Sequence, residues 1–231
     1  MSLFRRRTAD TPASEEAVSE TPDATPTSGR PQGPWDASEV DLTVGRLDLG
    51  SLLISPTQGL ELRIEMDQET DTIAGIQLIV GESAAQVQAF AAPRSGGQWD
   101  EIREELAASI VAAGGTVEQE DGEFGSELRV RLPQVSPEGR TVFAPARFLG
   151  IEGPRWFVRA VVSGRAALDT QGVDPVIEAL RGLVVVRGAH PMAPRELLPL
   201  RLPETTTEEP AQPATPSLDP FERGPEITEV H

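Results

Sequence analysis

Cysteine, lysine, tyrosine and asparagine are absent from the 231-residue sequence, and histidine occurs only at His190 and His231. Without cysteine the chain has no disulfides, no thiolate nucleophiles and no cysteine-ligated zinc. Without lysine it has neither Schiff-base chemistry nor the phosphate-binding loop that depends on a lysine. Because His190 is the only histidine in the central part of the chain and no G-x-S-x-G motif occurs, we expect no catalytic residues, no metal site and no cofactor.

Long apolar runs are also missing. No run approaches the roughly 18 residues that a membrane-spanning helix needs, and the first residues, MSLFRRR, lack the apolar segment of a secretory signal. We therefore expect a cytoplasmic protein with no transmembrane segment. The only basic cluster, Arg5, Arg6 and Arg7, predicts at most a weak contact with a membrane surface, since each arginine contributes only about 1 kcal/mol.

Positive charge is scarce: 20 arginines face 37 acidic residues, which gives a net charge of −17. Residues 1–34 carry 4 arginines and 5 acids, residues 35–203 carry 15 and 25, and residues 204–231 carry 1 and 7. The net charges are therefore −1, −10 and −6. A domain with this excess of acid disfavours nucleic acid as a partner.

Composition divides the chain into three parts. Residues 1–34 and 204–231 consist largely of Thr, Pro, Ser, Ala and Glu and show no hydrophobic period. Such segments bury too little apolar surface to offset the entropy of ordering, so we predict a disordered N-terminal tail and a disordered acidic C-terminal tail. Residues 35–203 have the length and the apolar content of a single domain.

Within this domain the hydrophobic period is mostly two, which is typical of strands. Strand patterns occur at residues 47–54, 60–66, 76–80, 85–92, 128–132, 142–150, 156–163 and 183–186. Two segments have helical spacing instead: residues 99–113, which end before Gly114, and residues 174–182, in which Asp174 precedes Pro175 as a cap. The pattern predicts an α+β fold, with a mainly antiparallel sheet packed against two principal helices.

Two acidic clusters invite a functional interpretation. The acids of EMDQETDT (65–72) alternate as calcium ligands do, but Thr72 and Leu78 stand where a calcium loop starting at Asp67 needs Gly and Glu. We interpret this segment and EQEDGE (118–123) as polar hairpin tips.

Arg94 is the first of three candidate site residues. It precedes Ser95-Gly96-Gly97 at the start of the first predicted helix, where free backbone N–H groups favour an anion. The alternative is an ion pair with Asp100 or Glu101.

The other two candidates are Arg155, in the Gly153–Trp156 turn, and His190. If the fold brings them to Arg94, the three residues form one anion-binding pocket. The alternating pattern also assigns several arginines, Arg155 among them, to strands. We expect these arginines to pair with glutamates across the sheet. The arginines are Arg129, Arg131, Arg155 and Arg159, and the glutamates are Glu61, Glu65 and Glu127.

The aromatic residues are few, and we expect them to be core residues. Trp99 heads a helical stripe that continues with Ile102, Leu106 and Ile110. It is therefore predicted to lie between the first helix and the sheet.

Five ordered motifs carry a family resemblance: GPWD (33–36), DLGSLLI (48–54), FAAPRSGGQWDEIR (90–103), GPRWFVR (153–159) and VVVRGAHPMAPRELLPLRLP (184–203). Together they resemble actinobacterial proteins of the domain of unknown function 3710 family. The resemblance implies an intracellular protein of high-GC bacteria with no assigned activity, so no catalytic residue is carried over. More loosely, the order of elements is similar to the PsbP-like α/β/α sandwich, which implies a fold and not a function.

These observations favour a non-enzymatic protein-binding or adaptor domain whose partner is another protein. The alternative that stays open is a small-molecule enzyme or sensor with an anion site near Arg94, the Gly153–Trp156 turn and His190.

Overall fold

The computed structural model describes residues 33–168 and 174–203. The predicted tails, 1–34 and 204–231, lie outside this part of the chain except for Gly33 and Pro34. No helix of the described residues is long and apolar enough to cross a membrane.

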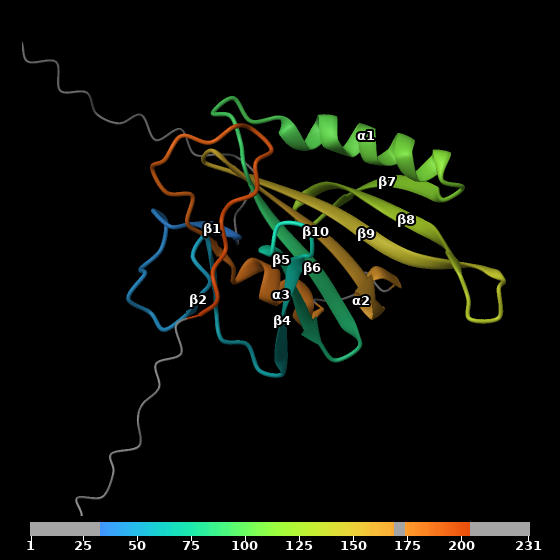
Figure 1. Ribbon diagram of the computed structural model, residues 1–231, viewed down its shortest axis with the longest axis horizontal. Helices are drawn as coiled ribbons and strands as arrows, with labels where there is room; N and C mark the ends of the chain where they lie inside the picture. Colours follow the sequence, from blue (N-terminus) through green and yellow to red (C-terminus); the bar gives the residue numbers. More distant parts are fainter. Residues whose placement is uncertain (1–32, 169–173, 204–231) are drawn as a thin grey trace, which may run out of the picture.

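A seven-stranded sheet forms the centre of the structure (Figure 1). Its strand order is β4 (Leu60–Asp67), β5 (Thr72–Val80), β6 (Ser83–Ala91), β10 (Trp156–Gly164), β9 (Thr141–Gly153), β8 (Gly125–Val135) and β7 (Thr116–Gly122). Every neighbouring pair is antiparallel. The prediction of a mainly antiparallel sheet with a few helices is therefore confirmed, whereas the PsbP-like sandwich stays a prediction.

Helices pack against both faces of this sheet. Successive side chains of a strand point to opposite faces, and both faces carry apolar side chains that the helices cover. On one face, Phe148 and Leu128 pack with Ile110 of α1 (Gln98–Ala112). On the other face, Leu149 and Val158 belong to the main core, which includes residues of α2 (Arg165–Leu168) and α3 (Pro175–Arg181).

Both principal helices agree with the sequence prediction to within one or two residues. In α3 the carboxylate of Asp174 accepts a hydrogen bond from the N–H of Val176 at 2.9 Å, and Pro175 occupies the first turn. Helix α1 ends before Gly114, whose φ of 84° suits glycine. The four-residue helix α2 was not predicted.

A second, four-stranded sheet completes the main core. Its order is β1 (Trp35–Asp36), β11 (Val184–Val185), β3 (Leu52–Ile54) and β2 (Leu47–Asp48). The prediction of one strand over residues 47–54 is wrong, because β2 and β3 pair with each other. Gly50, with φ 86°, makes the reversal between them.

The acidic segment 118–123 reaches the predicted hairpin tip only at its end, because the β7–β8 turn lies between Gly122 and Gly125. Its residues up to Gly122 belong to β7, at the edge of the large sheet. Charged side chains are common on edge strands because they discourage pairing with another chain, so polarity here did not indicate a turn. The other acidic segment contains a turn, in which Asp67 accepts hydrogen bonds from the N–H groups of Glu69 and Thr70.

Candidate functional site

The start of α1, where Arg94 was expected to hold an anion, is occupied by a carboxylate of the protein itself. Glu152 of β9 accepts hydrogen bonds from the N–H of Gly97 at 2.9 Å and from the N–H of Trp99 at 2.8 Å. These are donors that a helix N-terminus leaves without an intrahelical partner. Glu152, on the neighbouring strand β9, therefore offsets the partial positive charge at the start of the helix.

Arg94 itself is exposed. Its predicted partners bind elsewhere: Asp100 pairs with Arg103 at 2.9 Å, and Glu101 pairs with Arg195 at 3.0 Å. The predicted ion pair of Arg94 is therefore wrong among the described residues.

Arg155 and His190 do lie near one another, through a third residue. The Arg187 guanidinium donates to the carbonyl oxygen of Arg155 at 3.2 Å and to that of His190 at 3.0 Å. Arg155 lies in the β9–β10 turn, not on a strand, with a φ of 60°, and its guanidinium donates to the carbonyl oxygen of Gly188 at 3.5 Å. The N–H of Ala92 donates to the Arg155 carbonyl at 2.9 Å, which places the strand before Arg94 at the same end of the sheet.

His190 is exposed and lines an open hollow of about 800 Å³ together with Met192, Glu196 and Arg201. Within residues 33–168 and 174–203, no carboxylate hydrogen-bonds its imidazole, so it lacks the orienting partner of a general base. The same part of the chain holds no group of three or more His, Asp or Glu side chains placed to bind a metal ion.

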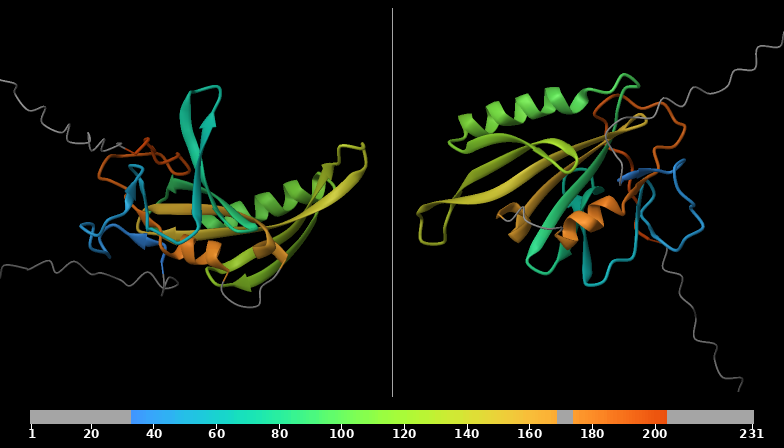
Figure 2. Two further views of the ribbon diagram at one scale, coloured as in Figure 1. Left: turned by 90° about the horizontal axis from the view of Figure 1, so that it is seen from below. Right: turned by 180° about the vertical axis from the view of Figure 1, so that it is seen from behind.

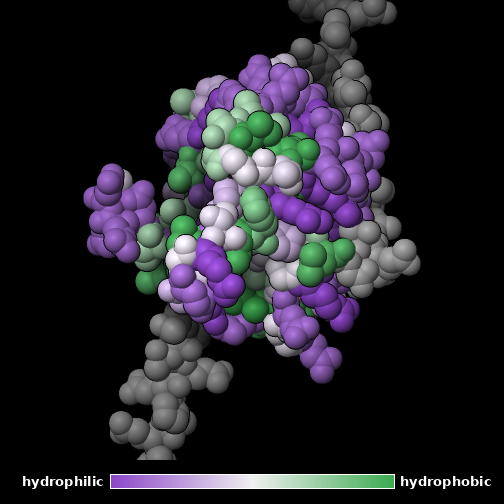
Figure 3. Space-filling view, turned by 90° about the vertical axis from the view of Figure 1, so that its right-hand side faces the viewer, coloured by the Kyte–Doolittle hydropathy of each residue, from purple (hydrophilic) through white to green (hydrophobic). Residues whose placement is uncertain are grey.

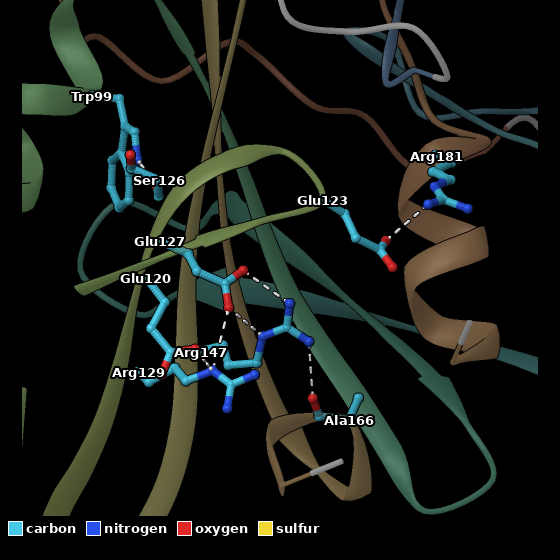
Figure 4. Close-up of polar contacts among 9 residues, drawn as sticks. All are labelled: Trp99, Glu120, Glu123, Ser126, Glu127, Arg129, Arg147, Ala166 and Arg181. Carbon is cyan, nitrogen blue, oxygen red and sulfur yellow. Dashed lines mark hydrogen bonds and ion pairs between the residues drawn. The ribbon is translucent and has the colours of Figure 1, made fainter. Parts of the chain in front are cut away.

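A buried ion pair joins β8 to β9 (Figure 4). The Arg147 guanidinium donates to both carboxylate oxygens of Glu127, at 2.9 and 2.8 Å, and to the carbonyl oxygen of Ala166 in α2 at 3.1 Å. Glu127 is 2% exposed and Arg147 is 5% exposed. Because each guanidinium nitrogen and both carboxylate oxygens have a partner within the protein, we interpret the pair as a structural connection between the sheet and α2.

None of the predicted arginine–glutamate pairs across the sheet forms among the described residues. Arg129 does meet a glutamate across the sheet, at 2.9 Å, but that residue is Glu120 of β7, whereas Glu127 lies on β8 with Arg129 itself. Arg159 instead donates to the side-chain oxygen of Gln88, and Arg131 has no ion pair among the described residues. The predicted pairs of Arg131, Arg155 and Arg159 with glutamate are therefore wrong.

Strands β8 and β9 continue beyond the strands that flank them. The pairing of β7 with β8 ends at Arg131, and the pairing of β10 with β9 ends at Arg147. Residues 132–144 therefore form a two-stranded hairpin, here called the arm, which extends from the sheet in both views of Figure 2.

The arm exposes large apolar side chains. The register pairs Pro133 with Phe143 and Val135 with Thr141, so these side chains share one face. Val135 is 78% exposed and Phe143 is 52% exposed, so the prediction that the aromatic residues are core residues is wrong for Phe143. Figure 3 views the molecule from the side on which the arm ends, where hydrophobic side chains lie among hydrophilic ones.

A smaller hollow, of about 340 Å³, lies between α1 and the sheet. Phe90, Leu106 and Phe157 form its apolar walls, and the side chains of Arg159 and Arg195 also line it. Burial lowers the pKa of Arg159, although an arginine remains protonated at neutral pH.

Residues 33–209 match the family model described as Protein of unknown function (DUF3710). The chain belongs to this family. No curated protein and no solved structure matches the sequence. The family description assigns no role to any residue.

Proposed function

We propose that this DUF3710 member is a non-enzymatic protein-binding domain, an adaptor that holds its partner on the arm. The observation that carries the proposal is the exposure of Val135 and Phe143 on a two-stranded extension of the sheet. An isolated hairpin of this kind is only marginally stable in water. A partner that covers the apolar face would stabilise the arm and remove this surface from solvent.

The backbone of the arm supports the same proposal. Beyond Arg131 and Arg147 no strand of the described residues pairs with the outer side of either strand, so both outer edges present hydrogen-bonding groups. An extended segment of a partner can pair with such an edge, while its side chains contact Phe143 and Val135.

Charge selects the kind of partner. The chain carries a net charge of −17, so a second copy would meet strong repulsion. A protein with a basic surface around an apolar patch would be attracted instead. The proposed partner is therefore a basic protein, neither nucleic acid nor a second copy, and we propose a cytoplasmic location for the complex.

The test compares three versions of the full chain. The first is the parent, and the second carries Val135→Ser and Phe143→Ser. The matched control carries Leu42→Ser and Val44→Ser, which changes two similarly exposed apolar residues outside the arm. Proteins retained from a lysate of the source organism are quantified, and each candidate is then purified and titrated against all three versions.

We expect a basic protein that binds the parent and the control alike, binds the arm variant at least about tenfold more weakly, and dissociates as salt rises. The proposal is wrong if purified candidates bind all three versions equally. It is also wrong if native mass spectrometry shows a dimer of the parent that the arm variant loses.

The alternative small-molecule site at Arg94, Arg155 and His190 has less support. Arg187 holds Arg155 and His190 near each other only through their carbonyl oxygens. The helix donors that would complete the site already bind Glu152.

A further inference from the structure

We propose that the hollow between α1 and the sheet binds a small amphipathic carboxylate, with an apolar body between the helix and the phenylalanines and its carboxylate on Arg159. This proposal concerns a different surface from the arm and goes beyond the protein-binding function. The hollow has a volume of about 340 Å³. That volume lies at the lower end of the range for small-molecule sites, roughly 300–1,000 Å³.

The walls of the hollow are aromatic and aliphatic. Phe90 of β6 and Phe157 of β10 stack with their ring centres 6.1 Å apart, and Trp99 stacks behind Phe157 at 5.9 Å. Ile102 and Leu106 of α1 line the hollow from the other side. An apolar ligand body would replace water on these surfaces.

Arg159 provides a cation without a counter-ion. Its guanidinium lies 5.8 Å from the centre of the Phe90 ring and donates to the side-chain oxygen of Gln88. Its Nε is buried without a hydrogen-bond partner, and among the described residues no carboxylate contacts it. Arg159 is half-buried, and a cation partly withdrawn from water is stabilised by an anionic partner, so the arrangement favours a ligand that supplies one.

The other charged groups of the hollow pair with one another and leave Arg159 available. Arg195, at φ 67°, is held by its N–H to the Ala91 carbonyl at 2.9 Å. Its guanidinium pairs with Glu105 at 3.2 Å and with Glu101 at 3.0 Å. The two glutamates neutralise Arg195, so among the charged residues that line the hollow Arg159 is the one whose charge no described carboxylate offsets.

These features select the ligand class. A carboxylate can accept two parallel hydrogen bonds from a guanidinium, which a neutral alcohol cannot reproduce. A cationic ligand would be repelled by Arg159. The expected ligand therefore has one carboxylate and an apolar tail or ring about the size of octanoate.

The test uses octanoate as the probe and the full chain as the receptor. Binding is followed by calorimetry and by backbone amide NMR shifts, with 1-octanol and octylamine as neutral and cationic controls. Arg159→Gln removes the charge, and Ser109→Phe fills the hollow from α1 while leaving every charge in place. Arg63→Gln is the matched control, because Arg63 is an exposed arginine on β4 outside the hollow.

We expect octanoate to shift the amides of residues 88–90 and 157–159, and 1-octanol to bind at least about tenfold more weakly. Arg159→Gln and Ser109→Phe should each weaken octanoate binding by at least about tenfold, and Arg63→Gln should leave it unchanged. The arm variant should also bind octanoate normally, so the two proposals can fail separately.

The proposal is overturned if 1-octanol binds as tightly as octanoate, or if folded Arg159→Gln retains the parent affinity. It is equally overturned if octanoate, decanoate and 4-phenylbutyrate all fail to bind. If Arg159→Gln does not fold, the affinity of Ser109→Phe for octanoate tests the proposal instead. Ser109 is exposed on α1, so this substitution should leave the fold intact.

Discussion

Glu152 accepts a hydrogen bond from the backbone N–H of Trp99 at 2.8 Å, across 53 residues of sequence. Its second carboxylate oxygen accepts from the N–H of Gly97 at 2.9 Å. One side chain of β9 thus caps α1 and fixes the end of the helix against the sheet, which is a task usually performed by a residue next to the helix.

Replacing Glu152 with alanine should therefore lower the free energy of unfolding by about 0.5–2 kcal/mol, the usual cost of losing a helix cap. Urea denaturation of the two proteins measures the difference. Glu138→Ala, in the exposed β8–β9 turn, is the control and should change little. Equal midpoints for Glu152→Ala and Glu138→Ala would contradict a capping role.

Trp99 lies between α1 and the sheet, as its position in the sequence predicted. It is 6% exposed, and its indole N–H donates to the Ser126 carbonyl at 2.6 Å. Trp99→Ala should cost about 3–5 kcal/mol through lost burial and the remaining cavity. Chemical denaturation gives the value, and a cost under about 1 kcal/mol would show that this indole does not support the core.

Gly150 of β9 lies directly under the Trp99 ring, and a methyl group there would overlap it. Gly150→Ala should therefore destabilise the domain by about 1–3 kcal/mol, the range for overpacking. Gly45→Ala is the matched control, because nothing lies within 4 Å of the added carbon. Thermal unfolding measures the midpoints of both variants, and we expect the lower midpoint for Gly150→Ala. Equal midpoints would contradict the close contact between Gly150 and Trp99.

The buried pair of Glu127 and Arg147 makes a different prediction. Removing one partner, by Glu127→Leu or Arg147→Met, should cost about 3–5 kcal/mol because the other charge remains buried. The double variant Glu127→Leu/Arg147→Met should lose less than either single variant, since no charge is left unpaired. A double-mutant cycle of unfolding free energies measures the coupling, and simple additivity would contradict it.

Asp48 links stability to acid pH. The N–H of Gly50 and then the Arg201 guanidinium hold the pKa of Asp48 below its ordinary value. A lowered carboxylate pKa contributes stability that is complete above the unfolded pKa of about 3.9 and is lost as pH falls through the folded pKa. Below about pH 4 the denaturation midpoint of the parent should approach that of Asp48→Asn. A constant difference down to the lowest pH would be the contrary result.

Local features of the sequence determined the regular elements. The alternation of Leu60, Leu62 and Ile64 predicted β4, and the Asp174-Pro175 pair marked the start of α3. Both signals are local, because strand and helix periods and caps depend on neighbouring residues. Local polarity misled the prediction in β7, because most of the acidic segment expected at a hairpin tip belongs to the edge strand that leads to that tip.

The candidate sites depended on contacts that no local pattern encodes. The sequence predicted that Arg94 holds an anion at the start of α1, but the order of the strands brings the carboxylate of Glu152 to that position. The strand pattern predicted an ion pair between Arg159 and a glutamate, whereas the antiparallel register places Arg159 beside Gln88 and Phe90. Partners of this kind are separated by tens of residues, so their distance is decided only when β6, β9 and β10 pair and α1 covers them.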